Sequence, residues 1–287
     1  MDVTEFEARR ASVDTPSGQI GYVETGDPNA PVALFVHGVI VNSYLWRHQL
    51  DDLSDLRRCV AVDLLGHGHS VARGPDHSFT AQARMLAEFL DALGIDQVDL
   101  IANDSGTGIA QLFAVAEPGR VRTLALTNGD VHDNWPPADF AGFVEMVRDG
   151  GLAATVQAMV DDPDRYRAPD GLGGAYSRPE KIDDSTVEAY LLPYLDRTDT
   201  VAGLEAFILG FDPAQTVAVE NELKALDVPT LVVWGTGDIF FDVGWSHWLA
   251  ETLPQVRRRA EILGAHLLLP EEYPGDLNAE LREHLTA

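Results

Sequence analysis

One short segment of the chain combines a reactive side chain with the spacing that a sharp turn requires. In the run Ala102-Asn103-Asp104-Ser105-Gly106, a carboxylate has a small residue two places before it and another two places after it. This small–x–nucleophile–x–small pattern is typical of a strained strand-to-helix turn that lifts the central side chain above a sheet. A carboxylate at such a point can attack carbon and form an ester intermediate. The expected substrate therefore carries a good leaving group on sp³ carbon.

The segments around Asp104 predict the elements that such a turn needs. Residues 97–101 predict a buried strand, and residues 108–114 predict the helix that follows it. The same alternation of apolar strands and helices recurs on both sides, which predicts a doubly wound, mostly parallel sheet of the α/β class. The other expected strands lie at 32–36, 58–62, 121–127, 229–234 and 258–262, the other expected helices at 43–53, 79–93, 245–252 and 277–285, and a hairpin at 6–25.

The pattern changes near residue 130, where strand-like runs stop. From 131 to 222 the sequence favours helices only, at 140–148, 152–160, 185–195 and 201–209. We therefore expect a core formed by residues 1–130 and 223–287, with an α-helical cap inserted at 131–222.

Composition limits the classes of protein that fit. A chain of 287 residues suits one large α/β domain with an insertion. Its formal net charge of −26 makes nucleic acid and anionic membranes poor partners. No apolar run approaches a membrane-spanning length, and the first residues show no secretory signal, so we expect a cytoplasmic protein. The single cysteine, Cys59, excludes an intramolecular disulfide.

Two further motifs accompany the turn at Asp104. His37-Gly38 precedes the run Ser43-Tyr44-Leu45-Trp46-Arg47, and an apolar strand at 58–62 leads into Gly66-His67-Gly68-His69-Ser70. In this order the motifs resemble the α/β-hydrolase superfamily, and within it the haloalkane dehalogenase and epoxide hydrolase branch, which uses an aspartate nucleophile. The resemblance covers nearly the whole core and is weak in the cap. It implies an α/β-hydrolase fold and no metal or organic cofactor.

The resemblance also implies a nucleophile, an acid and a histidine, in that order along the chain. Asp104 is the nucleophile, Asp238 follows the next-to-last strand as the acid, and His266 follows the last strand as the base that activates water. Asp130, after the preceding strand, is the alternative to Asp238. The backbone N–H groups of Val39 and Ser105 are the expected oxyanion hole.

Two positions depart from the dehalogenase pattern. Haloalkane dehalogenases place tryptophan after the nucleophile and often asparagine after His-Gly, and their N–H groups hold the departing halide. Here Ser105 and Val39 occupy those positions. Opening of an epoxide to a diol is therefore the first expectation, and carbon–halogen hydrolysis is the alternative. Tyr190 and Tyr194, four residues apart on one helical face, are candidate acids for the opening ring oxygen.

Other interpretations stay open at this point. Ser105 could be the nucleophile of a serine esterase, and the chain could be a homologue that binds a ligand without turnover or performs cofactor-independent oxygen or proton chemistry. The expected partners are a small apolar organic substrate and water. The residues expected at the pocket are His37, which braces its loop, and Trp135, Phe140 and Phe207.

Overall fold

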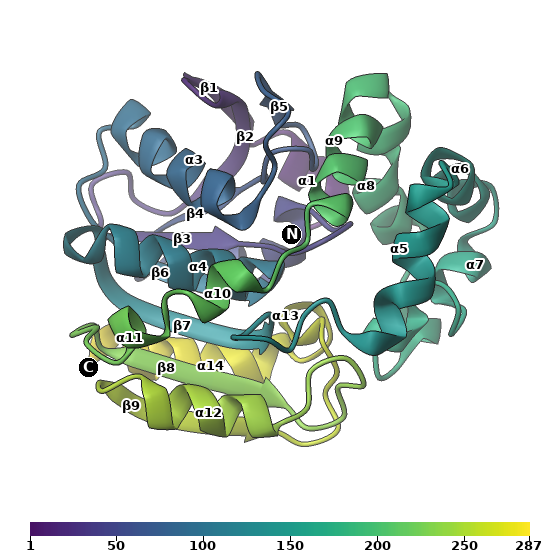
Figure 1. Cartoon of the computed structure of the whole chain (residues 1–287). Helices are drawn as coiled ribbons and strands as arrows, with labels where there is room; N and C mark the ends of the chain where they lie inside the picture. The colour runs from purple at the N-terminus through teal and green to yellow at the C-terminus, as the bar shows by residue number, and fades with distance from the viewer.

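A twisted sheet forms the centre of the molecule (Figure 1). The computed structural model describes residues 1–287, apart from the side chain of residue 198. In the described residues the sheet has nine strands, and all neighbours from β4 to β9 are parallel. The order across the sheet is β1 (Arg10–Thr15), β2 (Gly18–Thr25), β4 (Arg58–Val62), β3 (Val32–Val36), β6 (Val98–Asp104), β7 (Val121–Gly129), β8 (Thr230–Gly235) and β9 (Val256–Ile262), while β5 (Val71–Ala72) pairs with β2.

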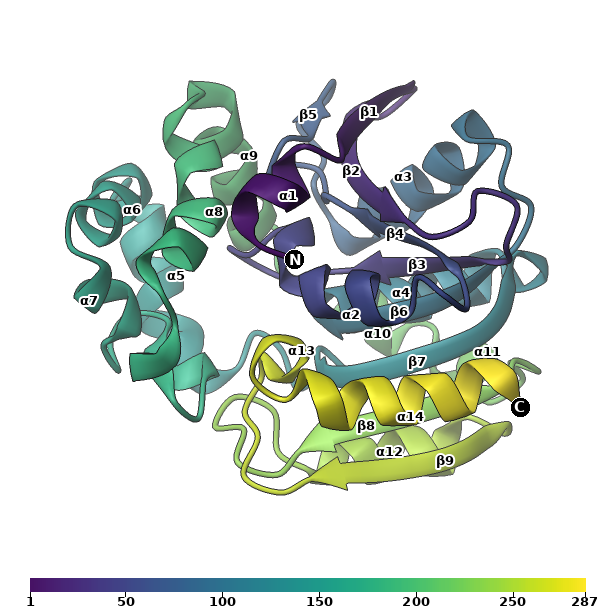
Figure 2. The same ribbon diagram turned by 180° about the vertical axis from the view of Figure 1, so that it is seen from behind.

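Helices cover both faces of this sheet, which explains why its central strands are apolar on both sides. All five residues of β3 and all seven of β6 are buried. Figures 1 and 2 show the two layers from opposite sides. One layer contains α2 (Arg47–Asp52) and α14 (Pro274–Thr286), and the other contains α3 (Phe79–Ala92), α4 (Ser105–Ala116) and α12 (Gly244–Thr252). The predicted doubly wound, mostly parallel sheet is confirmed.

Short helices complete the connections within the core. They are α1 (Val3–Glu7), the 3-10 turns η1 (Ser43–Trp46) and η2 (Pro118–Arg120), and α13 (Leu269–Glu272). The antiparallel β1 and β2 form the expected hairpin. It begins at Arg10 rather than at residue 6, because Asp2 and Glu5 form a capping box that starts α1.

Between β7 and β8 the described residues form helices and turns only. The helices are α5 (Ala141–Arg148), α6 (Leu152–Asp161), α7 (Pro163–Arg167), α8 (Asp184–Leu195) and α9 (Thr198–Leu209), with the 3-10 turns η3 (Ala138–Phe140), η4 (Gly173–Ala175) and η5 (Pro179–Lys181). Figure 1 shows α5 to α9 standing to one side of the sheet, and we call these helices and the turns that connect them the cap. The expected cap range, 131–222, also includes α10 (Ala214–Val217) and most of α11 (Glu220–Leu223), which instead contact α4.

One stretch between the cap helices lies along the core. We call residues 174–178 the cap strap. Its Ala175 carbonyl accepts a hydrogen bond from Leu268 N–H at 3.0 Å. The N–H groups of Ser177 and Arg178 donate to the Glu272 carboxylate at 2.7 and 2.8 Å. The cap is therefore tied to α13 and to Leu268, the residue just before it.

A buried ion pair strengthens the same attachment. Arg47 on α2 donates to Glu271 Oε1 at 2.6 Å, and both side chains are almost fully buried. Tyr176 and Tyr190 donate their hydroxyl hydrogens to the other Glu271 oxygen, at 3.1 and 2.9 Å. Burial lowers the pKa of Arg47, but the carboxylate of Glu271 more than compensates and raises it. Glu271 thus joins two cap tyrosines to a core arginine.

Among the described residues, none forms part of a helix with the length and apolar character needed to span a bilayer.

Candidate active site

The turn between β6 and α4 places Asp104 in a strained position. Its backbone has φ 58° and ψ −130°. Residues other than glycine seldom adopt a positive φ. The turn is also crowded, because a Cβ at Gly106 would lie 2.4 Å from the carbonyl oxygen of Val36. A Cβ at Gly129, on the neighbouring β7, would lie 2.1 Å from the Asp104 carbonyl oxygen. Gly106 and Gly129 are therefore required, because a larger residue at either position would clash with the backbone.

The Asp104 carboxylate lies against the loop after β3. The Val39 N–H donates to Asp104 Oδ2 at 2.8 Å. Burial raises the pKa of Asp104 to about 7, and the Asp238 charge adds to the rise. The backbone N–H groups of Val39 and Ser105 oppose it. The two N–H groups expected to form the oxyanion hole thus both act on this carboxylate.

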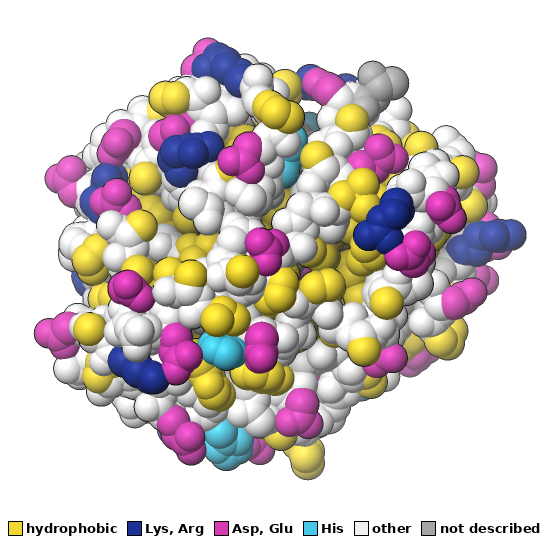
Figure 3. Space-filling model, viewed as in Figure 1, with side chains coloured by type: hydrophobic (Ala, Val, Ile, Leu, Met, Phe, Trp, Pro, Cys, Tyr) yellow, Lys and Arg dark blue, Asp and Glu magenta, His cyan; other side chains and the backbone are white. Residues whose placement is uncertain are grey.

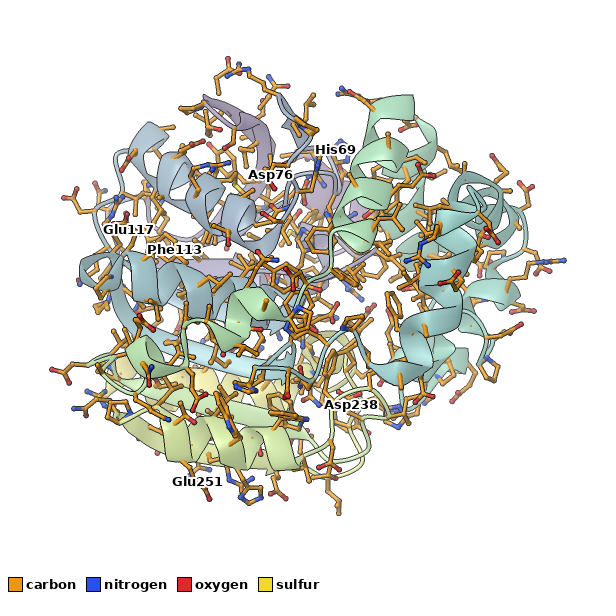
Figure 4. All side chains as sticks on the ribbon, viewed as in Figure 1. His69, Asp76, Phe113, Glu117, Asp238 and Glu251 are labelled. Atoms are coloured by element: carbon orange, nitrogen blue, oxygen red, sulfur yellow. The ribbon has the colours of Figure 1, made fainter. Side chains whose placement is uncertain are left out.

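Asp238 lies just beyond β8, at the end of the sheet that faces the cap (Figure 4). Asn128 Nδ2 donates to its Oδ2 at 2.7 Å, and the N–H groups of Phe240 and Phe241 donate to its Oδ1 at 2.9 and 3.3 Å. Burial raises the pKa of Asp238 to about 6, while these hydrogen bonds and the imidazole of His266 oppose the rise. The carboxylate is firmly oriented by its neighbours.

His266 follows β9 and faces the cap strap. Its Nδ1 lies 3.1 Å from the carbonyl oxygen of Gly174. Since a carbonyl oxygen only accepts hydrogen bonds, Nδ1 carries the proton, and Nε2 of the neutral ring is free to accept one. The ring packs so closely on Gly237 that a Cβ there would lie 2.9 Å from its Cδ2.

The expected hydrogen bond between Asp238 and His266 is not formed in this structure. Both side chains are described, and no ring nitrogen of His266 lies within 4.0 Å of a carboxylate oxygen of Asp238 or of the alternative acid Asp130. The Asp238 oxygens already accept three N–H donors, and the Gly174 carbonyl takes the place of a carboxylate at Nδ1. The pair still interacts through space, since the imidazole lowers the pKa of Asp238.

Asp130 follows β7 and lies beside Asp104. It is 3% exposed. Its N–H donates to the Asp104 carbonyl oxygen at 3.3 Å, and its own carbonyl accepts from Gln111 Nε2 at 3.0 Å. Burial, and then the charge of Asp104, raises the pKa of Asp130 well above its ordinary value, while the Ser105 side chain opposes this.

A cavity opens over Asp104 and Asp130, at the boundary between cap and core. The volume that the centres of water molecules can occupy there is about 50 Å³. The cavity therefore has room for more than one water molecule. The lining is largely apolar and comes from both parts of the chain. Figure 3 shows further apolar side chains on the surface along this boundary. The cavity is lined by Val39, Val41, Asp104, Ser105, Asp130, Pro137, Phe140, Leu172, Ala175, Phe211, Phe240, Phe241, Leu267 and Leu268.

Of the four residues expected at the pocket, Phe140 lines the cavity. The other three are buried beneath its walls. The His37 Nδ1 hydrogen-bonds to the carbonyl of Gly38 at 2.8 Å, and its Nε2 accepts from Leu64 N–H at 3.0 Å, so it braces two loops. Trp135 stacks on Phe79, and Phe207 packs edge-on against the ring of His67.

The two candidate cap acids do not line the cavity either. Tyr190 is fully buried and donates its hydroxyl hydrogen to Glu271. Tyr194 is buried beside His67, and its hydroxyl has no partner among the described residues. As their helical spacing predicted, both tyrosines lie on one face of α8. That face packs against the core and does not reach the cavity.

Several residues of this site were not expected from the sequence. The Asn128 amide orients Asp238, and the Gly174 carbonyl holds His266. Phe240 and Phe241 combine a hydrogen bond to Asp238 with a wall of the cavity. Their positions, two and three residues after Asp238, were the signal in the sequence that could have indicated them. Nothing in the sequence indicated Gly174, because it contributes only its backbone.

No metal site accompanies these groups. Among the described residues, no three or more histidine, cysteine, aspartate or glutamate side chains gather in a way that could hold a metal ion.

Comparison with known proteins identifies the family. Residues 31–273 match the model of the family described as the alpha/beta hydrolase fold, and the chain belongs to that family. It is 29% identical over 282 residues to epoxide hydrolase 3 of Xenopus tropicalis, which covers 92% of this chain and 74% of that protein. Over 117 residues, 41% of this chain, it is 38% identical to a haloalkane dehalogenase of Mesorhizobium japonicum, and the matched part spans 38% of that relative.

The fold of this chain also matches the folds of solved structures. The crystal structure of the haloalkane dehalogenase DbeA from Bradyrhizobium elkani matches with a TM-score of 0.78 at 23% identity, covering 96% of this chain and 97% of DbeA. The predicted resemblance to the α/β-hydrolase superfamily, with haloalkane dehalogenase and epoxide hydrolase relatives, is therefore confirmed. The chain is a hydrolase of this fold.

Proposed function

We propose that this hydrolase opens epoxides to diols through an alkyl ester on Asp104. The backbone strain at Asp104 carries the proposal, because it identifies the side chain that the turn presents to the cavity. Ser105 is instead the first residue of α4. A carboxylate held by the Val39 N–H is a nucleophile towards carbon, whereas the serine of an esterase would have to occupy the strained position.

In the proposed reaction Asp104 attacks a ring carbon and the carbon–oxygen bond of the epoxide breaks. The free Nε2 of His266 then takes a proton from water, which attacks the carbonyl carbon of the ester. The N–H groups of Val39 and Ser105 hold the oxygen that becomes negative in this step. Hydrolysis returns the Asp104 carboxylate and releases the diol.

The lining of the cavity favours an epoxide over a haloalkane. None of the lining residues has a side-chain N–H group. A departing halide would find no such donor beside Asp104, whereas a departing epoxide oxygen stays attached to the substrate and needs a proton. The epoxide hydrolase of Xenopus tropicalis also matches over most of this chain, while the dehalogenase matches over less than half. Carbon–halogen hydrolysis is the alternative for the same nucleophile.

The ester itself is the decisive observable. In His266→Gln the first step should proceed and the second should stall. Mass spectrometry after incubation with styrene oxide should show enzyme plus one substrate, with the added mass on the peptide containing Asp104. Asp104→Asn is the matched control and should gain no mass. Modification of Ser105, or adducts with bromoalkanes alone, would contradict the proposal.

A further inference from the structure

An epoxide leaves a negatively charged oxygen when its ring opens, so the site needs a proton donor. The expected donors do not line the cavity. Tyr190 gives its hydroxyl hydrogen to Glu271, and Tyr194 is buried beside His67. Among the residues that line the cavity, the side chains able to carry a transferable proton are Asp104, Ser105 and Asp130. Since Asp104 is the proposed nucleophile, Ser105 and Asp130 remain as candidate proton donors.

The backbone fixes Asp130 beside Asp104. Gly129 pairs with Asp104 across β6 and β7, and the Asp130 N–H donates to the Asp104 carbonyl oxygen. On its other side, the Asp130 carbonyl accepts from the Gln111 amide of α4. Asp130 lines the cavity, and the Ser105 hydroxyl is the hydrogen-bond donor that acts on its carboxyl group.

The hydrogen bonds around the two carboxyl groups decide which of them holds a proton. Asp104 has the N–H groups of Val39 and Ser105, and it stands at the N-terminus of α4, where the helix dipole favours negative charge. Asp130 has only the hydroxyl of Ser105. Two buried carboxyl groups this close do not both ionise readily. The charge therefore settles on Asp104 and the proton on Asp130.

We propose that Asp130 is the general acid that protonates the opening epoxide oxygen. This inference rests on the proposed function. As the bond from Asp104 to carbon forms and the carbon–oxygen bond of the ring breaks, the Asp130 proton moves to that oxygen. The products are a hydroxyalkyl ester and the Asp130 carboxylate. Hydrolysis then places one proton from water on His266, and its return to Asp130 through solvent restores the starting state.

The surroundings of Asp130 define the expected pH profile. Among the titratable groups, Asp104 from the β6–α4 turn acts directly on Asp130, Asp238 beyond β8 acts on Asp104, and the imidazole of His266 acts on Asp238. His132, on the same loop as Asp130, is paired with Asp133 and Glu220. Ester formation needs Asp104 ionised and Asp130 protonated. Its rate should therefore rise and then fall with increasing pH, and the alkaline limb belongs to Asp130.

The test measures the first step alone. In the His266→Gln protein, rapid quenching and mass spectrometry follow formation of the ester from styrene oxide between pH 5 and pH 10. Adding Asp130→Asn should slow ester formation about 10²–10⁴-fold and remove the alkaline limb. The loss should be smaller with a trifluoromethyl-substituted oxirane, whose alkoxide needs the proton less. Asp133→Asn, an exposed carboxylate three residues away, is the matched control and should change neither rate nor profile.

A second substitution separates catalysis from folding. Asp130→Glu retains a carboxyl group and should keep an alkaline limb even where its rate is reduced, which a purely structural role would not produce. If Asp130→Asn is folded by circular dichroism and forms the ester at the parent rate with the parent pH profile, the acid role is wrong and the proposed function stands. If the parent protein itself forms no ester with any oxirane, both proposals fail.

Discussion

The Nδ1 atom of His266 lies 3.1 Å from the carbonyl oxygen of Gly174, so the candidate base of the core is held by the cap. That carbonyl fixes the same ring tautomer that a carboxylate would fix. It supplies no full negative charge, however, to stabilise the ring once it has taken a proton. Asp238 interacts with the imidazole through space, so we expect the proposed hydrolysis step to depend on both groups.

Loss of the Asp238 charge should slow the second step and spare the first. Asp238→Asn is expected to reduce the rate of ester hydrolysis about 10²–10⁴-fold, because the protonated imidazole loses its counter-charge. The ester should then accumulate during turnover of styrene oxide, as seen by mass spectrometry of quenched samples. Unchanged ester hydrolysis in Asp238→Asn, together with a large loss of ester hydrolysis in Asp130→Asn, would instead make Asp130 the partner of His266.

The glycine after His37 offers a test of the geometry at the proposed nucleophile, Asp104. A Cβ at Gly38 would lie 2.1 Å from Asp104 Oδ2, so Gly38→Ala must displace the carboxylate. We expect ester formation to fall at least about 10²-fold, as for a misplacement of about 1 Å. Gly74→Ala is the control, because nothing lies within 4 Å of its Cβ position. Rapid-quench rates for the two variants compare them directly, and equal rates would show that the turn is less crowded than described.

Stability should depend on pH through Asp104. Its pKa is about 7 in the folded protein against an ordinary value of 3.8. The folded state thus retains a proton that the unfolded chain releases, so this contribution is complete below about pH 4 and is lost as the pH rises through about 7. Asp104→Asn should remove the loss and stabilise the protein at pH 8 by up to about 4 kcal/mol, with little effect at pH 4.

Thermal or urea unfolding at the two pH values measures this difference. Asp149→Asn, a substitution of an exposed carboxylate, serves as the control and should be neutral at both. Equal stability of Asp104→Asn and the parent protein at pH 8 would mean that the folded site tolerates the charge without cost.

The ion pair between Arg47 and Glu271 should contribute more to stability than the surface pairs. Glu271→Gln leaves the buried guanidinium without its counter-charge and should destabilise the protein by roughly 3 kcal/mol. Glu280→Gln removes the partner of the exposed Arg258 and should cost less than about 1 kcal/mol. Chemical unfolding of both variants gives the comparison, and equal losses would show that Glu271 is not an anchor of the cap.

Much of the fold could be predicted because it follows local rules. The apolar run of β3 and the small residues around Asp104 require a buried strand and a tight turn, whatever the rest of the chain does. Residues Phe6 and Glu7 were expected in the hairpin but belong to α1, since the capping box at Asp2 acts over a shorter range than strand alternation.

The site was harder to predict where it depends on packing between distant elements. Helical periodicity shows that Tyr190 and Tyr194 share a face but does not show what that face meets, and Glu271 lies 81 residues from Tyr190 in sequence. Trp135 and Phe207 are aromatic and belong to the cap range, yet both fill the interior against Phe79. The hydrogen bond from His266 to Gly174 has no sequence signature, because any residue has a carbonyl group.

The cap strap restricts how the specificity of this protein can be altered. Residues 174–178 form successive hydrogen bonds with His266, Leu268, Glu271 and Glu272. The same series of hydrogen bonds therefore positions both the wall of the cavity and the candidate base. Grafting a foreign lid onto this scaffold would leave the imidazole without its support. A chimera that retains turnover would have to inherit residues 266–272 from the same donor as its lid.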